Sequence, residues 1–262
     1  MRDITVIIPL HEFNEKVKPL LENAIKTVPK ECNLNVSCGA NVNEKELFYL
    51  NDIFDGITIS CPTNKEEKDD FCTLINREVK NIGTKWFSIL EFDDEYTDIW
   101  FNNVREYIKI NPDISVFLPL TELLEFSNKR FISYGNEAPW ATSFSNEIGE
   151  IDNDCLQQFF DFNLTGGVYN TEDWNNEGGL KPSIKLTFWY EFLLRITNND
   201  KKVFVIPKLG YKHYVNREDS LFNKYRDTIS EEESNWWFEL AKKESFYKDD
   251  RNITYNNNEK GE

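Results

Sequence analysis

Hydrophobic positions in the first half of the chain follow two alternating spacings. Short apolar runs rich in β-branched residues, such as 4–9, are typical of strands buried on both faces of a sheet. Between these runs, apolar residues recur every three to four positions, as amphipathic helices require. The pattern predicts strands at 4–9, 34–37, 56–60, 86–90 and 115–118, and helices at 17–28, 47–54, 71–82 and 100–108. This alternation predicts an α/β fold in which helices flank a mostly parallel, Rossmann-like central sheet.

The second half of the chain is less regular. Residues 127–161 are polar and aromatic, with little periodicity, and we expect irregular structure there that orders over a ligand. The elements predicted beyond it are a turn at 175–180, a helix at 187–197, a strand at 203–207, a Pro-Lys-Leu-Gly turn at 207–210 and a helix at 231–244. We therefore expect one domain over residues 1–218, followed by a C-terminal helical extension and polar tail over 219–262.

Composition narrows the class of protein. A net charge of -16 argues against broad binding to a phosphate backbone, although a local basic groove from Lys201, Lys202, Lys208, Lys212 and Arg217 stays open. The five cysteines are an odd number without a C-x-x-C pair, which is typical of reduced thiols. The N-terminus lacks a signal-peptide pattern and no apolar run reaches the length of a membrane span, so we expect a cytoplasmic protein.

The candidate chemistry lies at the end of the central strand. The apolar run 86–90 leads directly into Glu91, Asp93, Asp94 and Glu95. Open α/β sheets bind their ligands at the carboxyl ends of strands, and carboxylates packed so closely repel one another unless a divalent cation relieves them. The alternative interpretation is a solvated acidic turn before a helix.

Four stretches, taken in order, resemble family 2 glycosyltransferases with the GT-A fold. They are residues 4–15 as the opening strand and first nucleotide loop; the helix 71–82, with Asn76 near its centre; Leu90-Glu91-Phe92-Asp93-Asp94, which resembles an Asp-x-Asp-Asp motif with Glu in first place; and Glu177-Gly178-Gly179-Leu180, the helix around 191–195 and the late His213. The resemblance covers roughly residues 4 to 220.

The resemblance implies a metal-dependent, inverting enzyme that moves a sugar from a nucleotide-sugar, UDP-sugar by default, to the hydroxyl of an unknown acceptor. Asp93 and His213 would bind Mn²⁺ or Mg²⁺, and Glu91 would reach the ribose or a metal-bound water. The residues implied for nucleotide-sugar binding are Pro9, His11, Glu12, Glu15, Asn76, Glu91, Phe92 and Asp93. Those implied for the acceptor side are Gly178, Gly179 and Trp189.

The chain departs from the family pattern at two places. The aspartate that family members often carry after the second strand is absent from residues 38–43, so the base identity is open. The Glu-Asp pair of the acceptor helix, which supplies the catalytic base, is replaced by Phe188-Trp189. Glu191 is one candidate for the base, and Asp173 or Glu172 is another.

Two other interpretations follow from these departures. Glu191 also has the spacing of a surface ion pair with Arg195, and without a base the chain would be a catalytically weak or inactive binding or assembly protein. A glycosyltransferase that acts on modified nucleic-acid bases is the remaining alternative.

Overall fold

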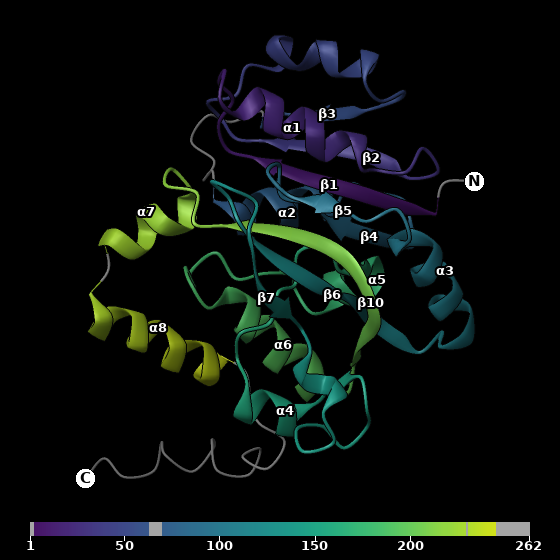
Figure 1. The fold of residues 1–262 in the computed structure, drawn as a ribbon, viewed down its shortest axis with the longest axis vertical. Coiled ribbons are helices and arrows are strands. Elements are labelled where there is room, and N and C mark those ends of the chain that lie inside the picture. Colours follow the sequence, from purple (N-terminus) through teal and green to yellow (C-terminus); the bar gives the residue numbers. More distant parts are fainter. Residues whose placement is uncertain (1–2, 63–69, 229, 245–262) are drawn as a thin grey trace.

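The computed structural model describes residues 3–62, 70–228 and 230–244 (Figure 1). Ten strands of these residues form one sheet, in the order β3-β2-β1-β4-β9-β6-β10-β5, with β7 paired to β6 and β8 to β10. The pairs β1–β2, β2–β3, β1–β4 and β6–β10 are parallel. The predicted α/β fold with a central sheet flanked by helices is confirmed, and the sheet is mixed because the pairs made by β5, β7, β8 and β9 are antiparallel.

The first half of the chain is built as its hydrophobic pattern predicts. Its elements are β1 (Ile4–Leu10), α1 (Val17–Lys26), β2 (Asn33–Cys38), η1 (Glu44–Asp52), β3 (Thr58–Ser60), α2 (Phe71–Val79) and β4 (Trp86–Ile89). The 3₁₀ helix η1 replaces the α-helix expected at 47–54. The reason is visible in the spacing, because Leu47, Leu50 and Ile53 lie three residues apart, which matches three residues per turn.

The second half adds strands to the far side of β4. Its elements are β5 (Glu95–Tyr96), α3 (Trp100–Ile110), β6 (Ile114–Glu125), β7 (Phe131–Gly135), η2 (Ala138–Trp140), β8 (Glu150–Ile151), α4 (Asn153–Gln158), β9 (Val168–Asn170), α5 (Thr171–Asn176), α6 (Phe188–Asn198), β10 (Lys202–Val215), α7 (Leu221–Thr228) and α8 (Glu231–Glu244). The region 127–161 therefore holds four short elements. Strands of two to five residues and helices of three to six are too short to show periodicity, so they escaped the sequence prediction.

The prediction of a turn at 207–210 is wrong. The strand β10 continues through it to Val215 and pairs with β6 along its length, with register shifts on both sides of Leu209. Pro207 has no N–H to donate, and the absent side chain of Gly210 leaves room for the Trp100 ring. A bulged strand, not a turn, therefore delivers His213.

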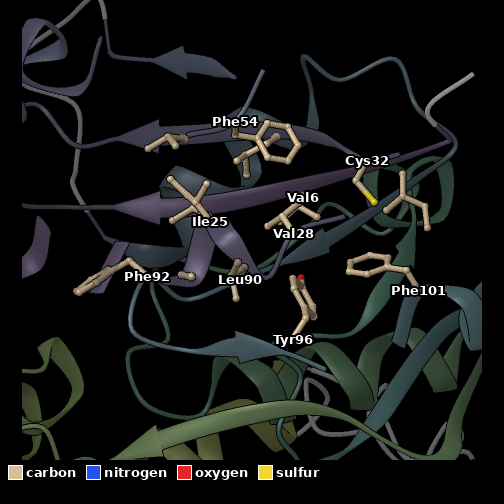
Figure 2. Packing of buried hydrophobic residues seen from close by; sticks show 14 of the residues in the cluster. Val6, Ile25, Val28, Cys32, Phe54, Leu90, Phe92, Tyr96 and Phe101 are labelled. Carbon is tan, nitrogen blue, oxygen red and sulfur yellow. The ribbon is translucent and has the colours of Figure 1, made fainter. Parts of the chain in front are cut away.

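Two hydrophobic cores lie on opposite faces of the sheet. Along β1, Val6 and Ile8 belong to one core and Ile7 to the other, as the period of two requires. The first core contains α1, η1 and α3, and Figure 2 shows Leu90, Phe92 and Tyr96 among its packed side chains. The second core contains α2, α4 and α6.

The helices α7 and α8 contact α6 (Figure 1). The Thr187 hydroxyl donates to the Trp237 carbonyl at 2.9 Å, and the Phe188 and Phe222 rings lie 5.7 Å apart. The helical extension thus packs on the rest of the protein, while the boundary at residue 218 stays a prediction. Across the described ranges, no helix combines the length and the apolar character needed to cross a bilayer.

The carboxyl ends of the parallel strands lie together at one edge of the sheet, where a ligand site is expected. The strands β1, β4, β6 and β10 run in the same direction, so their carboxyl ends share an edge. The helix α2 begins at this edge because it connects β3 to β4, and α6 ends at the opposite edge, where β10 begins. The first turns of both helices therefore lie toward the carboxyl edge.

We predict that Gly166→Ala destabilises both the fold and this edge. Gly166 has a φ of +78°, donates its N–H to the Ile89 carbonyl at 2.7 Å, and a Cβ there would collide with the Tyr211 ring. We expect a loss of about 2–5 kcal/mol in unfolding free energy from the left-handed backbone plus overpacking. Gly178→Ala is the control, since Gly178 has a φ of +81° but open space around it, and it should cost only about 1–2 kcal/mol. Urea denaturation measures both, and equal losses would contradict the steric argument.

Candidate functional site

Just beyond β4, buried side chains of the core alternate with partly exposed side chains of the candidate site. Leu90 and Phe92 are buried in the first core, whereas Glu91 and Asp93 between them are partly exposed. The Glu91 N–H donates to the Tyr211 hydroxyl oxygen on β10 at 3.1 Å. The predicted carboxylates therefore emerge at the carboxyl edge of the sheet, facing β10.

Asp94 joins this acidic segment to β10. Its buried carboxylate accepts the Tyr214 N–H at 2.8 Å and lies 2.7 Å from Nδ1 of His213. Burial lowers the pKa of His213, but the charge of Asp94 outweighs this effect and raises the pKa to about 10. The raised pKa favours the imidazolium form of His213 beside Asp94.

Glu91, Asp94 and His213 form a candidate metal centre. One ligand atom from each lies within 4.8 Å of the others, and within the described ranges no second cluster of this kind occurs. Burial, and then the charge of Asp94, raise the pKa of Glu91 to about 8, so the group holds more negative charge than its surroundings stabilise. Two carboxylates and one imidazole are ligands that suit Mn²⁺ or Mg²⁺.

Asp93 has a different partner from the one the resemblance implies. Its Oδ2 accepts from Nε of Arg217 at 2.8 Å, and Nη1 of Arg217 also contacts Asp219 at 2.9 Å. Burial and Asp94 raise the pKa of Asp93 to about 6, against the opposing effect of Arg217. The guanidinium lies 4.9 Å from the centre of the Phe92 ring. The metal-ligand role of Asp93 stays a prediction.

The residues predicted to bind the nucleotide divide into two groups. His11 follows β1, and its ring lies 6.0 Å from that of Phe92, the ring that Arg217 covers. Pro9 is buried within β1, while Glu12 is partly exposed and Glu15 is exposed. Asn76 instead binds the backbone of Leu180, with its amide donating at 2.6 Å and its oxygen accepting at 2.9 Å, and so anchors the turn at Gly178 and Gly179.

Glu191 is enclosed rather than on a helix surface. Its side chain has an exposure of 0%, and its two oxygens accept from Nε and Nη2 of Arg195 at 2.7 and 2.9 Å. Lys181 lies 3.3 Å away, and Arg195 also donates to the carbonyl of Gly179 at 2.7 Å. The expected ion pair exists, but it is buried and fixes the glycine turn. The neighbouring Trp189 is partly buried, in contact with Phe71.

Asp173 lies at the far edge of the sheet. The strand β9 runs antiparallel to β4 and pairs Asn170 with Trp86, so α5 begins at the amino edge. There Asp173 forms an ion pair with Lys201. The structure therefore does not bring Asp173 next to Glu91. The catalytic assignments of Glu191 and Asp173 stay predictions.

The basic residues considered for a nucleic-acid groove do not gather. Lys201 pairs with Asp173, Lys202 with Asp113 and Lys212 with Glu95, in addition to the pair of Arg217 with Asp93. Lys201 and Lys202 lie at the start of β10, just before it and at its first residue, while Lys212 and Arg217 lie near its other end, the latter just beyond Val215. Paired charges on opposite edges give no continuous basic stripe.

Sequence reasoning missed the roles of Asp94, Tyr211 and Arg217. All three act through contacts between residues about 120 positions apart. The available signal was electrostatic, since a cluster of buried acids needs cationic side chains near it.

Comparison of the sequence with models of protein families finds no match, and comparison with curated proteins finds none either. Solved structures do match the fold. The S. aureus TarS fragment 1–349 in complex with UDP-GlcNAc aligns with a TM-score of 0.68 at 16% identity, over 92% of this chain and 66% of that one. The mannosyltransferase PcManGT from Pyrobaculum calidifontis, in complex with GDP-Man and Mn²⁺, aligns with a TM-score of 0.60 at 11% identity, over 86% of this chain and 59% of that one.

These similarities confirm the predicted GT-A glycosyltransferase fold. The chain spans less than two thirds of the length of TarS 1–349 and of PcManGT.

We predict that Glu191→Gln lowers the unfolding free energy by about 3–5 kcal/mol, because it leaves the Arg195 charge buried without its partner. Asp3→Asn is the matched control. It breaks the more exposed pair with Arg105 and should cost no more than about 1 kcal/mol. Urea midpoints at constant m compare the two. If Glu191 were also the catalytic base, turnover per folded molecule would fall by roughly 10²–10⁴, whereas for an enclosed structural carboxylate we expect turnover to persist.

Proposed function

We propose that this protein is a glycosyltransferase that uses a divalent cation to move a sugar from a nucleotide-sugar to an acceptor hydroxyl. The observation that carries the proposal is the cluster of Glu91, Asp94 and His213 at the carboxyl edge of a GT-A fold. UDP-GlcNAc bound to TarS and GDP-Man bound with Mn²⁺ to PcManGT support a nucleoside diphosphate sugar as the donor. A UDP-sugar is our default.

The side chains at the site suit a cation. Among the described residues, the Glu91 carboxylate makes no hydrogen bond or ion pair, so its oxygens are available as ligands. Asp94 and His213 complete the group, and Asp93 would join it by exchanging Arg217 for the cation. A bound Mn²⁺ or Mg²⁺ would neutralise charge on the leaving diphosphate.

The protein's own residues hold and orient the donor. Once released from Asp93, Arg217 would contact the diphosphate, and His11 and Phe92 would line the nucleotide side. With inversion, the acceptor oxygen bonds to the anomeric carbon from the face opposite the diphosphate. The bond from that carbon to the diphosphate oxygen breaks, and the electron pair leaves with the nucleoside diphosphate. The hydroxyl proton passes to a base, the role that the resemblance gives to Glu191 or Asp173.

A second candidate function is nucleotide-sugar binding without turnover. The enclosed carboxylate of Glu191 and the distant position of Asp173 favour it, because neither presents an oxygen to the acidic cluster. Release of free nucleoside diphosphate from UDP-GlcNAc or GDP-Man distinguishes the two functions without knowledge of the acceptor. Absence of release with either donor and either metal would favour the binding protein.

We predict that UDP or GDP raises the melting temperature only when Mn²⁺ or Mg²⁺ is present, because the acids repel a bare diphosphate. At a ligand concentration a hundred times the dissociation constant, linkage supplies about 2.7 kcal/mol. Differential scanning fluorimetry with and without a chelator measures the shift. Equal stabilisation in the chelator would exclude a metal-bridged site.

We also predict that Glu91→Gln and Asp93→Asn each weaken this metal-dependent shift by at least about tenfold in nucleotide affinity, the lower range for loss of a metal-site contact. Glu95→Gln is the control, because that neighbouring carboxylate faces Lys212 and Tyr214 instead. All three changes keep side-chain volume. A shift that survives in Glu91→Gln and Asp93→Asn would remove the basis of the proposed site.

A further inference from the structure

An apolar cavity of about 290 Å³ opens beside the first residues of α2 and α6, toward the carboxyl edge of the sheet. Its walls come from the first turn of α2, the segment leading into α6, and α7. We propose that this cavity is the acceptor subsite and that it takes a neutral aromatic ring carrying the acceptor hydroxyl. The inference rests on the proposed function, which leaves the acceptor unspecified.

The helix α7 connects the cavity with the segment that carries Arg217. This helix begins at Leu221, four residues after Arg217, and the Asn223 amide donates to the Arg217 carbonyl at 2.9 Å. Arg217 in turn binds Asp93. The same short segment therefore supplies a wall of the cavity and a charge of the site, which is the link that supports an acceptor role for the cavity.

Four of the ten residues that line the cavity are aromatic. The Phe71 and Phe188 rings lie 5.6 Å apart at 32°, and the Phe188 and Phe222 rings lie 5.7 Å apart at 35°. Phe71, Phe188 and Ile184 are buried, whereas Leu221 is 40% exposed. Aromatic rings pack favourably on further rings, and the volume is at the small end of ligand sites, where one or two fused rings fit.

The charge of the cavity indicates a neutral ligand. The lining contains one carboxylate, Asp70, and one amine, Lys185. Asp70 already caps α2, since it accepts from the N–H and the hydroxyl of Thr73, each at 2.9 Å. One charge of each sign gives no net attraction for an ion, and burial of an ion against these rings would cost desolvation energy.

The test uses 2-naphthol, a neutral aromatic alcohol, titrated by fluorescence into the full chain without nucleotide. Leu221→Trp fills the cavity from its exposed wall and should weaken binding by about tenfold or more, the scale of one lost ring packing site. Ile110→Trp is the control. It adds the same ring to a residue that is 75% exposed at the end of α3, and it should leave binding unchanged.

A second cavity variant and a charged analogue of 2-naphthol extend the test. If Leu221→Trp does not fold, Phe222→Leu removes one aromatic wall and should weaken 2-naphthol binding without the added bulk. Naphthalene-2-sulfonate carries the same rings with a charge and should bind more weakly than 2-naphthol. Tighter binding of the sulfonate, or equal 2-naphthol binding by wild type and the cavity variants, would overturn the proposal.

A separate titration with UDP and Mn²⁺ reports on the donor site alone. We expect Leu221→Trp to bind this nucleotide as wild type does. If the wild type binds 2-naphthol but does not bind UDP with Mn²⁺, the proposed function is overturned, and the acceptor role falls with it. The assignment of the cavity as a site for an aromatic ring would stand. The two failures are therefore distinguishable.

Discussion

The candidate site depends on the contacts that the buried carboxylate of Asp94 makes with β10. A buried carboxylate is costly unless hydrogen bonds and a positive charge compensate it. The Tyr214 N–H and the His213 ring supply both, and both belong to β10. The interaction therefore binds the segment after β4 to a strand more than a hundred residues later. His213 is held beside Glu91 as a direct consequence.

Packing on the other side of this segment holds Glu91 in place. The ring of Tyr211 lies against Gly166, and its hydroxyl accepts the Glu91 N–H. Leu90 and Phe92 are buried in the core, so Glu91 and Asp93 cannot turn inward without exposing them. Hydrophobic burial of Leu90 and Phe92 thus orients the carboxylates and keeps them close together despite their mutual repulsion. A cation at this site would require little rearrangement of Glu91, Asp94 and His213, because their ligand atoms already lie within 4.8 Å of one another.

Much of the fold could be predicted from the sequence, because its information is local. The β-branched run at 4–9 and the three- to four-residue spacing of α1 and α2 each report their own structure. The acidic segment after β4 was also visible, since it follows a buried strand directly. The rest was not local. The extension of β10 through Pro207 depends on its pairing with β6, which overrides the turn chemistry of Pro-Lys-Leu-Gly.

Side-chain partners were the least predictable part of the site. The spacing of Glu191 and Arg195 indicated a pair, but whether that helix face is exposed depends on the glycine turn that packs against it. The pair of Asp93 with Arg217 joins positions 124 residues apart and has no signature in either segment. Only the requirement that clustered acids find cations pointed toward it.

The charges at the site bear on the proposed function, because the donor it requires is an anion. Asp93 and Asp94 pair with Arg217 and His213, whereas burial and the charge of Asp94 raise the pKa of Glu91 to about 8 and favour its neutral form. Under the proposed function, a divalent cation would displace the protons of His213 and Glu91, and Asp93 would exchange Arg217 for the cation. The guanidinium, which keeps its contact with Asp219, would then face the diphosphate in a partly buried site, where electrostatic attraction is stronger than in water. Donor binding would thus be conditional on the cation, while the net charge of -16 over the whole chain has little influence at such short range.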